Sequence, residues 1–224
     1  MEAGQNNSAE AFEAMTQLCR TYWYPLYAYV RRKGYPAPDA QDLTQEFFAR
    51  LLARNYVTAA DRQKGKFRSF LLGTFEHFLA KEWRRAHAEK RGGGRAAFSL
   101  DEIDAENRYL LEPAHDLTPA KIFDRRWATT LLAQAMARLG EECRASQKEE
   151  LFEKVKELLS GDSADASYAQ MARSLNMTEG ALKVAVHRLR QRYGELVRAE
   201  IAQTVASPAE VDQELQHLLA TLRE

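Results

Sequence analysis

The feature that most constrains the fold is the segment 167–192, SYAQMARSLNMTEGALKVAVHRLRQR, which has the pattern of two helices joined by a tight turn. Asn176 follows the first helix, and asparagine tolerates the left-handed conformation that often ends a helix. Thr178 can cap the second helix, with Glu179 favourably placed in its first turn. The apolar residues of the first helix recur at helical spacing, so they can share one buried stripe: Tyr168, Met171, Ala172 and Leu175. We therefore predict a helix-turn-helix.

The second of these helices has two unlike sides. Its expected inner side carries Leu182, Val186, Leu189 and Tyr193. The opposite edge is exposed and basic, as in helices that enter the DNA major groove. The predicted DNA-binding residues on this edge are Thr178, Glu179, Lys183, Val184, His187 and Arg188. The alternative is a structural helical corner whose basic residues only complement the helix dipole.

The rest of the chain also has helical periodicity, and no segment shows the alternation of a strand. We therefore expect an all-α fold in which Pro25 kinks or interrupts the first helix. Thr118-Pro119 and Ser207-Pro208 are helix starts, each a cap followed by proline. The predicted organisation is a helical domain over 8–91, a flexible acidic linker over 92–118 and a second helical domain over 119–199. A C-terminal helical extension over 200–224 follows.

Charge is balanced overall, at 32 basic and 32 acidic residues, but it is distributed in blocks. Residues 61–95 and 183–198 are basic, whereas 99–125 and 200–224 are acidic. Two separate basic blocks fit two DNA contacts better than two solvated faces, although the latter remain the alternative.

The first basic block contains an aromatic residue beside positive charge, a combination typical of sites for single-stranded nucleic acid. The predicted DNA-binding residues here are Lys64, Lys66, Phe67, Arg68, His77, Lys81, Arg84 and Arg85. The alternative is that Phe67 is simply the first core residue of its helix. Upstream, an exposed ridge suits partner docking, or is only a solvated helix face: Asp42, Gln45, Glu46 and Ala49.

Several classes of function are disfavoured by the sequence. Cys19 and Cys143 have no metal-ligand spacing and indicate a reducing compartment. The glycine-rich 91–95 lacks the Walker spacing, and the histidines show no HExxH pattern. The N-terminus lacks a signal peptide, and no apolar run is long enough to cross a bilayer. We expect a cytoplasmic protein that is not an enzyme, with no metal, cofactor or membrane partner.

The C-terminal helix carries an apolar stripe too wide to leave in water: Val211, Leu215, Leu218, Leu219 and Leu222. We expect it to pack back on the protein, beside the helix-turn-helix or against the N-terminal domain. There it could tune access to DNA or to a partner, or serve equally well as a structural strut.

Three segments together resemble the extracytoplasmic-function (ECF) sigma factors of bacterial RNA polymerase. They are DAQDLTQEFFARLL, KFRSFLLGTFEHFLAKEWRR and YAQMARSLNMTEGALKVAVHRLRQRY, and they occur in the family's order. The resemblance implies that the ridge around Asp42, Gln45 and Glu46 docks on core RNA polymerase and that the loop before Phe67 captures a flipped base of the minus-ten element. It also implies that the helix-turn-helix reads the minus-thirty-five element of promoter DNA, and that an anti-sigma factor or other regulator is a further partner. The alternative is a stand-alone helix-turn-helix regulator that binds duplex DNA without polymerase.

Overall fold

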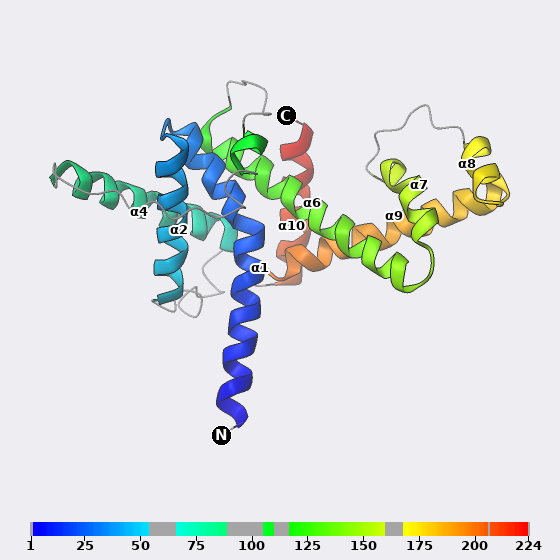
Figure 1. Ribbon diagram of the computed structural model, residues 1–224, viewed down its shortest axis with the longest axis horizontal. Helices are drawn as coiled ribbons and strands as arrows, with labels where there is room; N and C mark the ends of the chain where they lie inside the picture. Colours follow the sequence, from blue (N-terminus) through cyan, green and yellow to red (C-terminus); the bar gives the residue numbers. More distant parts are fainter. Residues whose placement is uncertain are drawn as a thin grey trace. The chain divides into compact units, whose positions relative to one another are not determined.

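In the computed structural model, the residues that can be described are 2–53, 66–88, 105–109, 117–159, 168–205 and 207–223. Within these ranges the secondary structure is helical, with turns and no strand, so the all-α expectation is confirmed (Figure 1). The loop before Phe67, including Lys64, lies outside the described residues. No helix in the described ranges is long and apolar enough to cross a membrane.

The chain divides into two compact units whose bounds differ from the sequence-based domains. Unit 1 comprises Met1–Thr129 together with Thr204–Glu224, and unit 2 comprises Thr130–Gln203. Unit 2 is therefore an insertion between two parts of unit 1. The difference arises because the C-terminal helix belongs with the N-terminal part of the chain and is no separate extension.

Unit 1 begins with α1 (Glu2–Arg32) and α2 (Ala37–Ala53), which pack against each other (Figure 1). Gly34 lies in the turn between them with φ of +93°, a conformation that favours glycine. The expected interruption at Pro25 is absent, since α1 runs through this residue as one helix. The other long helices in the described part of unit 1 are α4 (Phe67–Ala88), the first part of α6 (Pro119–Ala145) and α10 (Pro208–Arg223).

Large aromatic side chains dominate the core of unit 1. Tyr22 and Phe123 stack at 6.5 Å, and Phe47 and Phe75 lie 4.7 Å apart between their ring centroids. All four residues are nearly inaccessible to solvent. Burial of such large rings supplies much of the driving force that holds α1, α2, α4 and α6 together.

Parts of the predicted linker are attached to α1. Residues 105–109 are helical, and Glu106 accepts two hydrogen bonds from Arg31, at 3.0 Å from Nε and 2.8 Å from Nη2. Arg108 lies over the ring of Tyr24, at 3.9 Å from its centroid, and Arg32 donates to the carbonyl of Leu117 at 2.8 Å. The described parts of the linker are thus attached to α1 by polar contacts, which cannot be inferred from the lack of helical periodicity.

Unit 2 contains the second part of α6, then α7 (Glu149–Leu159), α8 (Tyr168–Ser174) and α9 (Glu179–Ala202). Helices α7 and α8 both pack on α9 (Figure 1). The fully or nearly buried apolar residues include Leu131, Leu139, Phe152, Val155, Leu182, Val186, Leu196 and Ile201. This core holds the α8–α9 pair in place.

We predict that Gly140→Ala destabilises unit 2. A Cβ at this position would lie 2.9 Å from Cε1 of Phe152, a ring that is only 6% exposed. The better helix propensity of alanine, about 1 kcal/mol, would be outweighed by overpacking of ~1–3 kcal/mol. Thermal unfolding monitored by circular dichroism would measure the change.

The control is Gly194→Ala on α9, where an added Cβ meets no atom within 4 Å. That substitution should stabilise the protein, because only the helix-propensity term of roughly 1 kcal/mol applies. Equal stabilisation by both substitutions would contradict the tight contact between Gly140 and Phe152.

Candidate nucleic-acid interface

The sequence predicts that the start of α4 binds DNA, and the structure places two of its cations beneath α10. Glu214 of α10 is 1% exposed, and its Oε1 lies 2.7 Å from Nζ of Lys66. Its Oε2 accepts a hydrogen bond from Nε of Arg68 at 3.2 Å. Arg68 is itself buried, pairs with Asp124 of α6 and lies over the ring of Trp127. In this conformation Arg68 is buried and Lys66 is only partly exposed, and their role in DNA binding stays a prediction.

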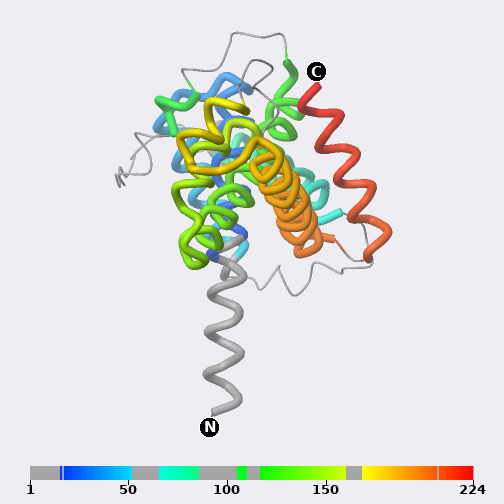
Figure 2. Tube along the Cα trace, turned by 90° about the vertical axis from the view of Figure 1, so that its right-hand side faces the viewer, coloured from blue at the N-terminus to red at the C-terminus, as the bar shows by residue number. Residues whose placement is uncertain are grey.

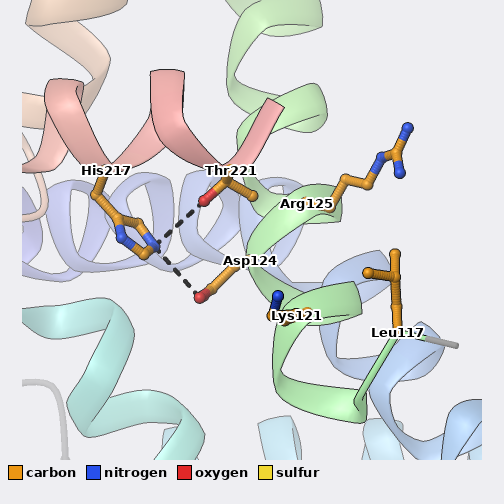
Figure 3. Close-up of a pocket in the computed structure, with 6 residues that line it drawn as sticks. All are labelled: Leu117, Lys121, Asp124, Arg125, His217 and Thr221. Carbon is orange, nitrogen blue, oxygen red and sulfur yellow. Dashed lines mark hydrogen bonds and ion pairs between the residues drawn. The ribbon is translucent and has the colours of Figure 1, made fainter. Parts of the chain in front are cut away.

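A second polar contact joins α10 to α6. Nε2 of His217 lies 3.2 Å from Oδ2 of Asp124, and Figure 3 shows the imidazole directed at this carboxylate and at Thr221. The hollow beside them is small, about 100 Å³. The expectation that the C-terminal helix packs back on the protein is thus confirmed, and its place is against α4 and the start of α6 in unit 1 (α10 is red in Figure 2).

The apolar side of α10 is less buried than its sequence suggests. Leu218 is inaccessible to solvent, whereas Leu219 is 47% exposed. The other members of the predicted stripe are half-buried: Val211, Leu215 and Leu222. The buried residues of α10 are therefore one leucine, Leu218, and one carboxylate, Glu214. The sequence pattern did not indicate that Glu214 would be buried in the contact with α4.

Phe67 is half-buried and contacts the protein core. Its ring meets the buried ring of Tyr22 edge-on, with centroids 5.6 Å apart, and its N–H donates to the carbonyl of Thr204 at 3.4 Å. This placement is closer to the alternative noted from the sequence, that Phe67 is the first core residue of its helix, than to an open stacking site. The prediction that Phe67 stacks a base is not supported by this placement.

The later cations of α4 are exposed. His77, Lys81 and Arg84 all face solvent, as does Arg85, which pairs with Glu82 at 3.3 Å. Helical spacing puts these four residues on one side of α4. This basic face of α4, defined by His77, Lys81, Arg84 and Arg85, matches the sequence-based set.

The sequence-based choice of site residues omits Trp83. It is 54% exposed, the most exposed large aromatic side chain among the described residues. It borders a hollow of about 360 Å³ whose charged lining residues are Lys33, Arg84 and Glu76. An exposed indole beside two cations has the composition of a site where a base stacks while its phosphate is neutralised. The sequence does not separate Trp83 from the other aromatic residues of α4, because Phe75 and Phe78 in the same helix are buried.

The ridge on α2 is exposed at its two ends, Asp42 and Ala49, while Gln45 and Glu46 are partly exposed. Glu46 pairs with Arg50 at 2.6 Å, and Arg50 also reaches Glu82 of α4 at 2.7 Å. The opposite side of α2 is buried through Phe47, Phe48 and Leu51, although Leu43 is only half-buried. The ridge is a polar surface on a well-anchored helix.

The α8–α9 pair has the local geometry that its sequence predicts. Asn176 has φ of +52°, and Oγ1 of Thr178 accepts a hydrogen bond from the N–H of Ala181 at 3.2 Å. Leu182 and Val186 are buried, and the six predicted DNA-binding residues of α9 and its cap all lie on the exposed side: Thr178, Glu179, Lys183, Val184, His187 and Arg188. Lys183 is paired with Glu179 at 2.6 Å, which raises the pKa of its ammonium group.

Two arginines further along α9 serve the fold of unit 2. Arg190 donates to the carbonyl of Leu158 at 2.7 Å, and Arg192 makes a bidentate pair with Glu142, with both distances 2.8 Å. The basic block 183–198 is thus only partly available for DNA. Arg190 and Arg192 are exposed as well, but each is engaged by a partner within unit 2.

Among the described residues, no group of three or more His, Cys, Asp or Glu side chains could hold a metal ion. Comparison of the chain with protein-family models, with curated proteins and with solved structures gave no match.

The electrostatic environment of Glu214 makes its contribution to stability depend on pH. Burial raises the pKa of its carboxyl group, but Lys66 and Arg68 together outweigh burial, so the pKa lies below the ordinary value of 4.5. A carboxyl whose pKa is lowered by folding stabilises the folded state above its unfolded pKa and loses this contribution as the pH falls through the folded pKa.

We predict that Glu214→Gln lowers the free energy of unfolding by about 2–3 kcal/mol at pH 7, because two cations lose their charged partner. The difference from wild type should shrink as the pH falls below 4.5, where the wild-type carboxylate is progressively protonated. Urea unfolding of both proteins at a series of pH values measures this difference in the free energy of unfolding. Gln213→Ala, an exposed substitution on the same helix, is the control. A difference that stays constant down to about pH 3 would contradict this account.

Proposed function

We propose that this chain is a bacterial sigma factor of the ECF type, which binds core RNA polymerase and directs it to promoters without catalytic activity of its own. The observation that carries the proposal is the α8–α9 pair. Its second helix is capped by Thr178, anchored by Leu182 and Val186, and exposes a basic edge around Lys183, His187 and Arg188. Such an edge suits a helix-turn-helix that reads duplex DNA in the major groove.

A second surface favours the sigma factor over a stand-alone regulator. The basic face of α4 and Trp83 belong to unit 1, whereas the helix-turn-helix belongs to unit 2. An exposed tryptophan among cations suits unpaired bases, which duplex-binding regulators do not need to hold. The ridge on α2 supplies a polar docking surface in unit 1, which we assign to core polymerase. The proposed location is accordingly the cytoplasm.

Run-off transcription with core polymerase tests the proposal. The chain should direct specific transcripts only when core enzyme is present, and should bind promoter DNA tightly only in that complex. Tight binding of duplex DNA by the free protein as a dimer on two half-sites, without any transcript, would instead establish the stand-alone regulator.

We predict that alanine at Lys183, His187 or Arg188 weakens binding of the upstream promoter element. A lost base-edge contact should cost ~1–3 kcal/mol and relax specificity at one position, whereas a lost phosphate contact weakens all sequences about equally and reduces the salt slope. Binding of holoenzyme to a promoter and to its single-position variants, at several salt concentrations, separates the two. Gln191→Ala, an exposed change further along α9, is the control. Wild-type affinity in all three variants would show that another face reads the DNA.

We predict that Trp83→Ala weakens binding of single-stranded DNA by about 5- to 150-fold, since stacking on an aromatic side chain is worth ~1–3 kcal/mol per base. Trp83→Phe should retain much of the affinity. Phe70→Ala is the matched control, because Phe70 is 38% exposed but does not line the hollow. Fluorescence anisotropy with a labelled oligonucleotide provides the measurement. An equal effect of Trp83→Ala and Phe70→Ala would argue against a base-stacking role for the hollow.

A further inference from the structure

The buried carboxylate of Glu214 lies between Lys66 and Arg68 where α4 begins. Each of its oxygens meets one cation, Oε1 at 2.7 Å from Nζ of Lys66 and Oε2 at 3.2 Å from Nε of Arg68. Two non-bridging phosphate oxygens would bind such a pair of donors in the same way. The acid comes from a helix 146 residues further along the chain than Arg68, so no local folding requirement places it there.

The charges at this site balance only while α10 is docked. Lys66 and Arg68 contribute two positive charges, and Glu214 and Asp124 contribute two negative ones. Departure of α10 removes Glu214 and leaves one positive charge in excess. Arg68 would keep Asp124 and its position over Trp127, 5.0 Å from the ring centroid, so the site would stay organised for an incoming anion.

The remaining contacts of α10 are consistent with a helix that can leave. Only Leu218 of its apolar stripe is fully buried, and Leu219 is 47% exposed. The polar contacts of Glu214, and that between His217 and Asp124, are with charged groups of α4 and α6. A polyanion such as DNA can compete for the cations among these groups, whereas it cannot compete for a purely apolar interface.

We propose that Lys66 and Arg68 form a binding site for a phosphate of single-stranded DNA, and that α10 closes this site in the free protein by placing Glu214 where the phosphate binds. The site opens when α10 leaves. The choice of DNA as ligand rests on the proposed function. The basic face of α4 stays accessible in both states, so docking of α10 weakens DNA binding and does not abolish it.

Two variants test the proposal: Glu214→Gln in the full chain, and a truncation after Val205 that removes α10. Hydrogen–deuterium exchange of 208–223 reports undocking in the full-length variant, and circular dichroism checks the fold of both. The ligand is a labelled single-stranded oligonucleotide of mixed sequence, with no polymerase present. If α10 is undocked in about 1–10% of free wild-type molecules, its release should raise affinity about 10- to 100-fold. The slope of log affinity against log salt should steepen by about 0.7 for each additional phosphate that is neutralised.

Two controls assign the effect to the site. Gln213→Ala changes an exposed side chain of α10 and should leave affinity and exchange near wild type. Lys66→Gln, added to either test variant, should remove the increase in affinity and return the salt slope toward that of wild type.

Unchanged DNA affinity in a protein whose α10 is undocked or deleted would overturn the proposal and make α10 a structural strut. Wild-type exchange of α10 in Glu214→Gln would overturn the role of Glu214 in holding it. If the truncated protein does not fold, Glu214→Gln decides alone. These measurements need no polymerase. A failed transcription assay would therefore refute the sigma-factor function but not the proposed closure of the site by α10. Likewise, unchanged DNA affinity would refute the closure but not the sigma-factor function.

Discussion

The buried carboxylate of Glu214 is central to the attachment of α10 to the rest of unit 1. Glu214 brings α10 onto Lys66 and Arg68 at the start of α4, and Arg68 extends the contact to Asp124 of α6. Transfer of a carboxylate from water into a protein interior is costly, and only well-placed cations with good hydrogen-bond geometry offset that cost. Here Oε1 lies 2.7 Å from Nζ of Lys66 and Oε2 accepts a hydrogen bond from Arg68. Together with buried Leu218 and the contact between His217 and Asp124, these interactions place the final helix in the unit formed by the beginning of the chain.

The same contact divides the charged residues in and next to α4 into two groups. Cations at the start of the helix are neutralised by α10, whereas Lys81 and Arg84 near its other end face solvent. The aromatic residues divide in a similar way, because Phe67 joins the core through Tyr22 and Trp83 lies outside beside a hollow. One helix thus combines a structural half with a half that exposes cations and an indole.

Helix α9 shows a comparable division. Its first half is anchored by Leu182 and Val186 and leaves its basic edge exposed. Further along, Arg190 and Arg192 bind a carbonyl of α7 and a carboxylate of α6. The residues that hold the helix and those that face solvent are therefore chemically alike, and only their partners distinguish them.

The sequence by itself determined the features that depend on neighbours a few residues away. The helical class, the starts at Pro119 and Pro208, the left-handed Asn176 and the Thr178 cap follow from periodicity and from backbone chemistry within one turn. The exposed edge of α9 and the basic face of α4 follow from the same periodicity. Tertiary structure alone decided which predicted cations are covered, where α10 packs and how the chain divides into units. Those outcomes rest on pairs such as Arg68 with Glu214 and Arg31 with Glu106, which are 146 and 75 residues apart. No local pattern encodes such a pairing, because each charged side chain looks equally solvated until the fold brings its partner to it.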